Sequence, residues 1–159
     1  MRRKLAILGV LAVAAATAVV AAAIASGSPG PKLAAPATVV VIEHATSDTV
    51  ADIAPRGDSD GDVLVFGNRV FDKTDARAVG RDQGYCLRIS AQKGRWECAW
   101  TTFLAAGQIT VEGPFYDAQP VSTLAVTGGT GSYKNPRGEL VLKTLAGGTK
   151  FRFTFNLQP

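Results

Sequence analysis

The stretch QITVEGPFYDAQPVSTLAVTGGTGSYKNPRG, residues 108–138, decides the fold of this chain. Its first part alternates, so that Ile109, Val111 and Phe115 share one face of a strand. Glu112 falls on the opposite face with other polar residues. The pattern predicts a strand with one buried side.

A glycine-dense turn follows the second strand of this stretch. The β-rich run at residues 122–127 leads into Gly128-Gly129-Thr130-Gly131, and glycine adopts backbone angles that are closed to other residues. The chain resumes an extended pattern after Asn135-Pro136. Corners of this kind, with a glycine or a bulge, are typical of closed β-barrels.

Strand patterns continue on both sides of this stretch, and there is no convincing helical period. They lie at residues 38–45, 63–72, 79–90, 95–106, 108–115, 122–127, 138–146 and 149–157. Eight antiparallel strands can close into a barrel whose interior holds one small ligand. We therefore predict an all-β fold, an eight-stranded antiparallel β-barrel.

The amino terminus predicts export. Three basic residues, Arg2, Arg3 and Lys4, precede an uncharged apolar run that ends in an A-x-A cleavage signal before Ser26. We interpret residues 1–25 as a cleaved signal peptide, and the alternative is an uncleaved membrane anchor. Residues 26–37 are predicted to be a flexible linker and residues 38–159 one domain of a secreted protein.

Charge and composition exclude several classes of function. The chain has 17 Lys and Arg against 13 Asp and Glu, and the leader holds three of the basic residues, which leaves 14 against 13. A nearly neutral domain argues against a nucleic-acid partner. The single histidine, His44, makes a zinc site or a Cys-His pair an unsupported hypothesis. We predict no metal and no cofactor.

An aspartate-rich turn at DSDGD has the start of a calcium loop. Asp58, Asp60 and Asp62 alternate as in such loops, but the twelfth position is Arg69 where a glutamate is needed. A solvated turn is the favoured interpretation.

The two cysteines, Cys86 and Cys98, lie on the arms of a predicted hairpin, each six residues from Gln92. Facing residues of a hairpin can be bridged, and an oxidising compartment favours the bond. A disulfide is predicted, with two free thiols as the alternative.

Four segments carry a family resemblance and occur in the same order as in that family. Along the chain they are GDVLVFGNRVF, VGRDQGYCLRI, ITVEGPF and STLAVTGGTGSYKNPRGELVLKTL, and the resemblance covers about residues 57–157. They resemble the allene oxide cyclase family, and the GGTG turn with its Arg-Gly also resembles the plant dirigent proteins that share this barrel. The resemblance implies a calycin-type barrel, a homotrimer, and a pocket that includes a glutamate, an asparagine and a cysteine.

Three positions match that pocket. The resemblance implies that Glu43 and Asn68 are catalytic and that Cys86 lines the cavity, although a strand-end glutamate in water is an equal interpretation of Glu43. Strand parity adds Phe66, Trp96 and Trp100 as ligand-binding candidates. Glu112 is a candidate as the charge most out of place in its strand, and Arg137 because it resembles the arginine after the dirigent glycine turn. For Glu112 a solvated outer position is the alternative, and for Arg137 a position on the rim.

The sequence departs from the cyclase pattern at Ala45, where the family has an asparagine two residues after the glutamate. The resemblance therefore implies a cavity more directly than the cyclisation of an allene oxide. We expect a secreted barrel that binds a small hydrophobic ligand and isomerises or cyclises it without a cofactor. The alternatives are a dirigent-type guide, a lipocalin-like binder, or a structural module with a filled interior.

Overall fold

The structure, a computed structural model, describes residues 35–159. The predicted signal peptide and nearly all of the predicted linker lie outside these residues. No helix within residues 35–159 combines the length and the apolar character that a membrane crossing requires.

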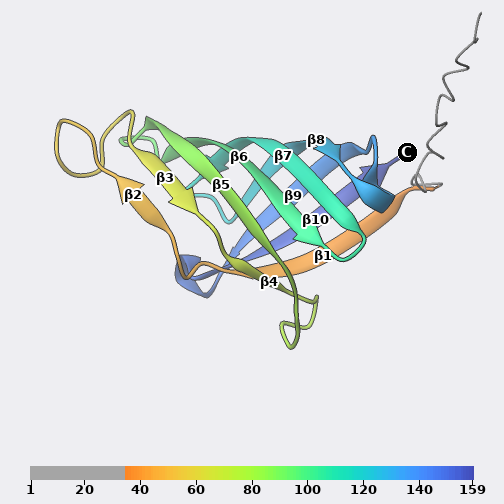
Figure 1. The fold of residues 1–159 in the computed structure, drawn as a ribbon. Helices are drawn as coiled ribbons and strands as arrows, with labels where there is room; N and C mark the ends of the chain where they lie inside the picture. Colours follow the sequence, from red (N-terminus) through yellow and green to blue (C-terminus); the bar gives the residue numbers. More distant parts are fainter. Residues whose placement is uncertain (1–34) are drawn as a thin grey trace, which may run out of the picture.

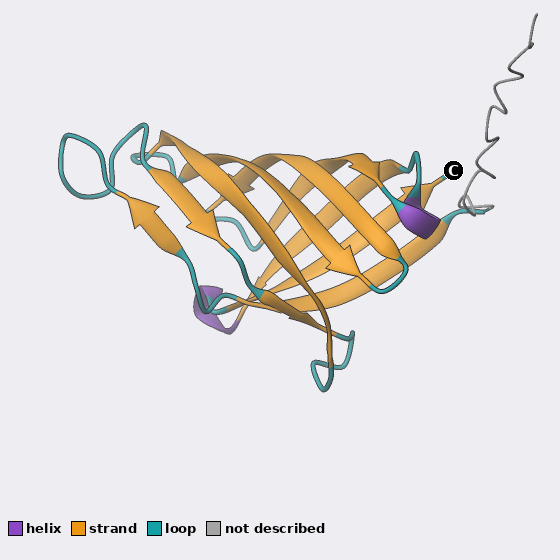
Figure 2. Ribbon diagram, in the orientation of Figure 1, coloured by secondary structure: helices purple, strands orange, loops and turns teal. Residues whose placement is uncertain are grey.

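Ten strands and two short 3-10 turns, Gly131–Tyr133 and Ala146–Gly148, make up the described chain (Figure 1 and Figure 2). The strands are β1 (Ala37–His44), β2 (Thr49–Ala51), β3 (Val63–Phe66), β4 (Arg69–Phe71), β5 (Ala78–Ser90), β6 (Arg95–Leu104), β7 (Gly107–Tyr116), β8 (Val121–Gly129), β9 (Arg137–Leu145) and β10 (Lys150–Gln158).

The sheet is a closed eight-stranded antiparallel barrel, as predicted. Around the barrel the strand order is β5, β4, β1, β10, β9, β8, β7 and β6, and the pairing of β6 with β5 closes the ring. Strand β3 also pairs with β5, beyond the end of β4. Strands β3 and β4 share one position in the barrel. Figure 1 shows the first and last strands, β1 and β10, side by side, and their register runs from Ala37 opposite Leu157 to His44 opposite Lys150. Closure leaves no long unpaired edge in the barrel wall.

Two details differ from the prediction. The strand expected at residues 63–72 is divided into β3 and β4, because Gly67 and Asn68 leave the ladder. The short strand β2 was expected to be loop, and it pairs with the outer edge of β3. Its three residues are all exposed, so no hydrophobic pattern marked it as a strand.

The turn after β8 shows why the glycines are needed. Gly131 has φ +62°, a left-handed backbone conformation that favours glycine. A Cβ atom on Gly129 would lie 2.4 Å from the carbonyl oxygen of Tyr133. At this corner two backbone segments therefore lie too close together for residue 129 to carry a side chain.

Alternation sorts the side chains of the β5–β6 hairpin as parity predicted. Cys86, Arg88 and Trp100 are buried inside the barrel, whereas Tyr85 and Leu87 are exposed outside it. On β10, Phe153 and Phe155 point into the core. The interior is thus apolar and rich in aromatic rings.

An ionic cluster joins two loops across one part of the barrel. The buried guanidinium of Arg88 donates to Asp58 Oδ1 over 2.7 Å and to Asp117 Oδ2 over 2.5 Å. It also lies 4.3 Å from the ring centre of Trp96, whose Nε1 donates to Asp117 over 2.9 Å. The cluster fixes the loop after β2 and the loop after β7 to the hairpin.

The predicted aspartate turn is held by protein groups. Asp62 is buried and accepts hydrogen bonds from the backbone of Ile53 and Ser59, and Asp60 accepts one from the backbone of Ala91. These donors, with Arg88 on Asp58, give each of the three carboxylates a partner in the protein.

Candidate functional site

An apolar cavity lies inside the barrel. Its volume is about 50 Å³. It is lined by Glu43, Asp48, Leu64, Phe66, Cys86, Cys98, Trp100, Phe115, Leu142, Phe151 and Phe153. One water needs roughly 10–15 Å³ by the same measure, so the cavity holds a few waters or one small molecule. Asp48 is exposed, which places the mouth near it.

Glu43 provides the polar group of the inner wall. It lies near the end of β1, with Phe151 of β10 on one side and Val70 of β4 on the other. The side chain is only 5% exposed. The alternative interpretation, a strand-end glutamate in water, is therefore wrong.

Asn68 holds Glu43 in place and has no free hydrogen-bonding group. Its Nδ2 donates to Glu43 Oε1 over 2.9 Å and to Asp48 Oδ1 over 2.7 Å. Its Oδ1 accepts from the backbone of Thr46 and Ser47 over 2.9 and 3.0 Å. Asn68 does not line the cavity. The geometry therefore gives it the position of an orienting residue behind Glu43.

A second buried carboxyl, Asp82 of β5, adjoins Glu43. Its Oδ1 accepts a hydrogen bond from the backbone N–H of Asn68 over 3.1 Å, and its side chain is 1% exposed. Within residues 35–159, no backbone N–H, side-chain N–H or hydroxyl group donates a hydrogen bond to Asp82 Oδ2. Asp82 was not predicted as a site residue. The available signal was its parity, because it alternates with Gly84 and Cys86 on the inward face of β5.

The two carboxyls bind protons more tightly than isolated ones. Burial, and then the negative charge of Asp82, raises the pKa of Glu43 from 4.5 to about 9. Burial raises the pKa of Asp82 from 3.8 to about 7, opposed by its hydrogen bonds from the Asn68 backbone and from Glu43. At neutral pH the pair therefore holds a proton on Glu43, which hydrogen-bonds to Asp82.

This arrangement can act as a general acid in an apolar space. A protonated carboxyl donates a hydrogen bond, and a pKa raised by burial is what allows a carboxylic acid to remain protonated near pH 7. The lining contains no lysine or arginine, and Glu43 is its buried acid.

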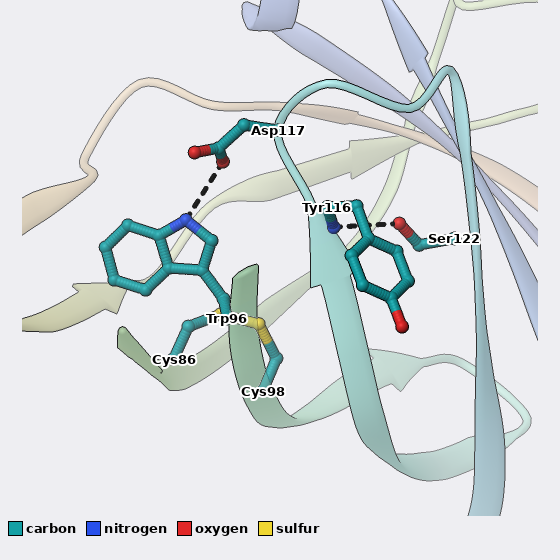
Figure 3. Close-up of a disulfide and its surroundings, with 6 residues drawn as sticks. All are labelled: Cys86, Trp96, Cys98, Tyr116, Asp117 and Ser122. Carbon is teal, nitrogen blue, oxygen red and sulfur yellow. Dashed lines mark hydrogen bonds between the residues drawn. A yellow bond between two sulfur atoms is a disulfide. The ribbon is translucent and has the colours of Figure 1, made fainter. Parts of the chain in front are cut away.

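The predicted disulfide forms one wall of the cavity. Cys86 and Cys98 face each other across β5 and β6 and are bonded (Figure 3). Neither cysteine is free, so no thiolate is available within the described residues. Residues 35–159 also contain no cluster of three potential metal ligands.

Three predicted ligand-binding residues do not reach this cavity. Trp96 points inward but lies beside the ionic cluster, as Figure 3 shows through its hydrogen bond to Asp117. Glu112 is exposed on the outer face of β7, as the alternative interpretation held, and Arg137 is exposed at the start of β9. By contrast, the lining includes the predicted residues Glu43, Phe66, Cys86 and Trp100.

Solved structures with this barrel differ widely in activity. A structure described as a pyocyanin demethylase matches with 26% identity and a TM-score of 0.68, over 77% of this chain and 100% of that one. A pterocarpan synthase dirigent protein matches with 16% identity and a TM-score of 0.66, over 77% and 94%. An exo-specific intermolecular Diels-Alderase matches with 14% identity and a TM-score of 0.61, over 78% and 98%. The last two show the fold alone.

The family to which this chain belongs is shown by a match along most of its sequence. The model of the family described as allene oxide cyclase matches residues 39–159, which is the barrel except for the first two residues of β1. The same segment holds the buried glutamate, the asparagine behind it and the cysteine of the cavity wall. This chain belongs to the allene oxide cyclase family.

Proposed function

We propose that the barrel binds a small hydrophobic molecule in its cavity and isomerises or cyclises it without a cofactor. The observation that carries this proposal is the buried carboxyl of Glu43 in the apolar inner wall of the cavity, where burial raises its pKa to about 9. A small reactive molecule in such a space is held in one conformer and meets one acid, which together lower the barrier for an intramolecular step.

The reaction can be written for an allene oxide, an epoxide with an exocyclic carbon–carbon double bond on one ring carbon and a further alkene on the other side. Glu43 donates a hydrogen bond to the epoxide oxygen while its C–O bond breaks, and negative charge grows on that oxygen. The apolar walls fix the conformer in which the new C–C bond closes the ring. The proton stays with Glu43 when the oxygen becomes a carbonyl, so atoms and charge balance within one substrate. Asn68 and Asp82 orient Glu43 throughout.

Comparisons support the class of function and leave the substrate open. The related barrels include a demethylase, a Diels-Alderase and a dirigent protein, and one fold commonly hosts several chemistries. The likeness to a dirigent protein favours one alternative, a guide that holds an intermediate made by another enzyme. A lipocalin-like binder is the form of this proposal without any reaction. The disulfide is consistent with export to an oxidising compartment, and we propose that the protein is secreted.

The test uses a short allene oxide with a neighbouring alkene and chiral analysis of its ring-closed ketone product. We expect purified protein alone to give an enantiomeric excess and to accelerate closure, and Glu43→Leu to slow it about 100-fold, a typical loss when one hydrogen-bond donor to a developing oxyanion is removed. Glu112→Leu, which removes an exposed carboxyl outside the barrel, is the matched control. The guide function is tested with a phenol and a one-electron oxidase. An effect on stereochemistry only in that mixture would support the guide, and no effect in either would contradict both.

The outer face of β3 and β5 supports a second proposal, a homotrimer. Val65, Tyr85, Leu87 and Ile89 are exposed, and Val65 pairs with Tyr85 across the two strands. Exposed apolar patches of this kind mark interaction sites. The family resemblance implies three copies of the chain as the assembly.

Leu87→Lys should dissociate this assembly. A lysine charge cannot be buried against an apolar partner surface without a large desolvation cost, so we expect the trimer mass of the unmodified protein to fall to that of a monomer. Light scattering after gel filtration measures this mass. Thr123→Lys adds the same charge on exposed β8 and should leave the mass unchanged. A monomeric unmodified protein at tens of micromolar would contradict the trimer.

A further inference from the structure

The indole of Trp100 has an unsatisfied donor next to the cavity. Trp100 is 6% exposed, and its ring packs against Phe66 and Phe153 at centroid distances of 6.2 and 5.4 Å. Its Nε1 is buried and has no hydrogen-bond partner within residues 35–159. The other tryptophan differs, because Trp96 Nε1 donates to Asp117. Buried indole N–H groups usually find a partner, so the missing one is informative.

The position of this indole is built into the barrel wall. Gly84 lies opposite Trp100 on β5, and a Cβ atom at Gly84 would lie 2.3 Å from the Trp100 Cβ. The absence of a side chain there is what lets Trp100 take its place. Phe66 and Phe153, which contact its ring, line the same cavity. The unpartnered N–H therefore belongs to a residue of the cavity wall itself.

We propose that the Trp100 indole N–H donates a hydrogen bond to the ligand, and that the ligand is an uncharged, flat, conjugated molecule with a carbonyl-type oxygen. This inference rests on the proposed function of the same cavity. The aromatic lining favours a flat conjugated skeleton. The lining has no cationic side chain, and Asp48 stands at the mouth, so an anionic ligand would be left without compensation.

The test compares two small probes of similar shape, acetophenone and ethylbenzene. Only acetophenone carries an acceptor oxygen. The chain has two tryptophans, so its NMR spectrum has two indole N–H resonances, and Trp96→Phe assigns them. We expect acetophenone to shift the Trp100 resonance and leave that of Trp96 in place. Ethylbenzene should bind without the hydrogen-bond shift.

Trp100→Phe keeps an aromatic ring and removes the donor. We expect the ratio of acetophenone to ethylbenzene affinity to fall about tenfold, the value of one good hydrogen bond. Thr102→Val is the matched control, since Thr102 Oγ1 is also buried without a partner but does not line the cavity, and it should keep the ratio.

The outcomes separate this inference from the proposed function. If both probes bind and the ratio is the same in Trp100→Phe, the donor role is wrong while hydrophobic binding stands. If neither probe binds, the binding function fails and the inference fails with it. If Trp100→Phe does not fold, the resonance of the unmodified protein decides, and an unmoved Trp100 signal with bound acetophenone overturns the proposal.

Discussion

The free energy of unfolding should fall by about 4 kcal/mol between pH 6 and pH 8, and Glu43→Gln should remove about two thirds of this decrease. The cause is the proton that Glu43 retains in the folded barrel, where burial and the charge of Asp82 raise its pKa to about 9. One retained proton changes stability by about 1.4 kcal/mol per pH unit.

The sign follows from where the proton is bound. A carboxyl whose pKa is raised on folding holds more protons folded than unfolded, so rising pH favours the unfolded chain from about the unfolded pKa of 4.5 up to about 9. Asp82 acts in the same direction up to about pH 7. The pKa values of Asp62, Asp72 and Asp75 are lowered by hydrogen bonds, so their stabilisation is lost only in acid, below this window.

Urea unfolding at pH 6, 7 and 8 measures the effect. Glutamine keeps the shape of Glu43 and cannot ionise, so the variant should lose the contribution of Glu43 and keep the smaller one of Asp82. The double variant Glu43→Gln/Asp82→Asn should show little slope. Glu112→Gln should keep the full slope, because Glu112 is exposed outside the barrel. Equal slopes in the unmodified protein and Glu43→Gln would contradict the shared proton.

The barrel and the faces of its strands could be predicted from the sequence because both follow from a period of two. Once Cys86 was taken to face inward, alternation placed Trp100 inside and Tyr85 outside, as the structure has them. The hairpin register followed from its turn, which set Cys86 opposite Cys98. Strand β2 was missed because its three exposed residues have no such pattern.

The composition of the site could be predicted only in part because it depends on distances along the barrel. Parity placed both Trp96 and Trp100 inside, but only Trp100 lies at the depth of the cavity. The meeting of Glu43 with Asp82 depends on the stagger of β1 against β4 and β5, which the chain fixes only on closure. Asn68 was identified, yet the five hydrogen bonds of its side chain, which make it an orienting residue, came only from the folded geometry.

Reducing the disulfide between Cys86 and Cys98 should lower the free energy of unfolding by about 3 kcal/mol. The bond joins residues 12 apart in sequence. Opening a loop of this length lets the unfolded chain gain conformational freedom, which lowers the free energy of unfolding by about this amount. Urea unfolding with and without a reductant measures the loss.

A matched variant separates the effect of the cross-link on stability from the effect of the volume of the two sulfur atoms. Cys86→Ala/Cys98→Ala should be less stable than the reduced unmodified protein, because both positions are buried and alanine enlarges the cavity beside Trp100. Equal stability of the oxidised and reduced proteins would contradict a stabilising bond.

Reduction also tests the chemistry of the cavity wall, since it creates two thiols there. If Glu43 is the acid, turnover per folded molecule should not rise on reduction, whereas a rise would point to a thiol as the reactive group.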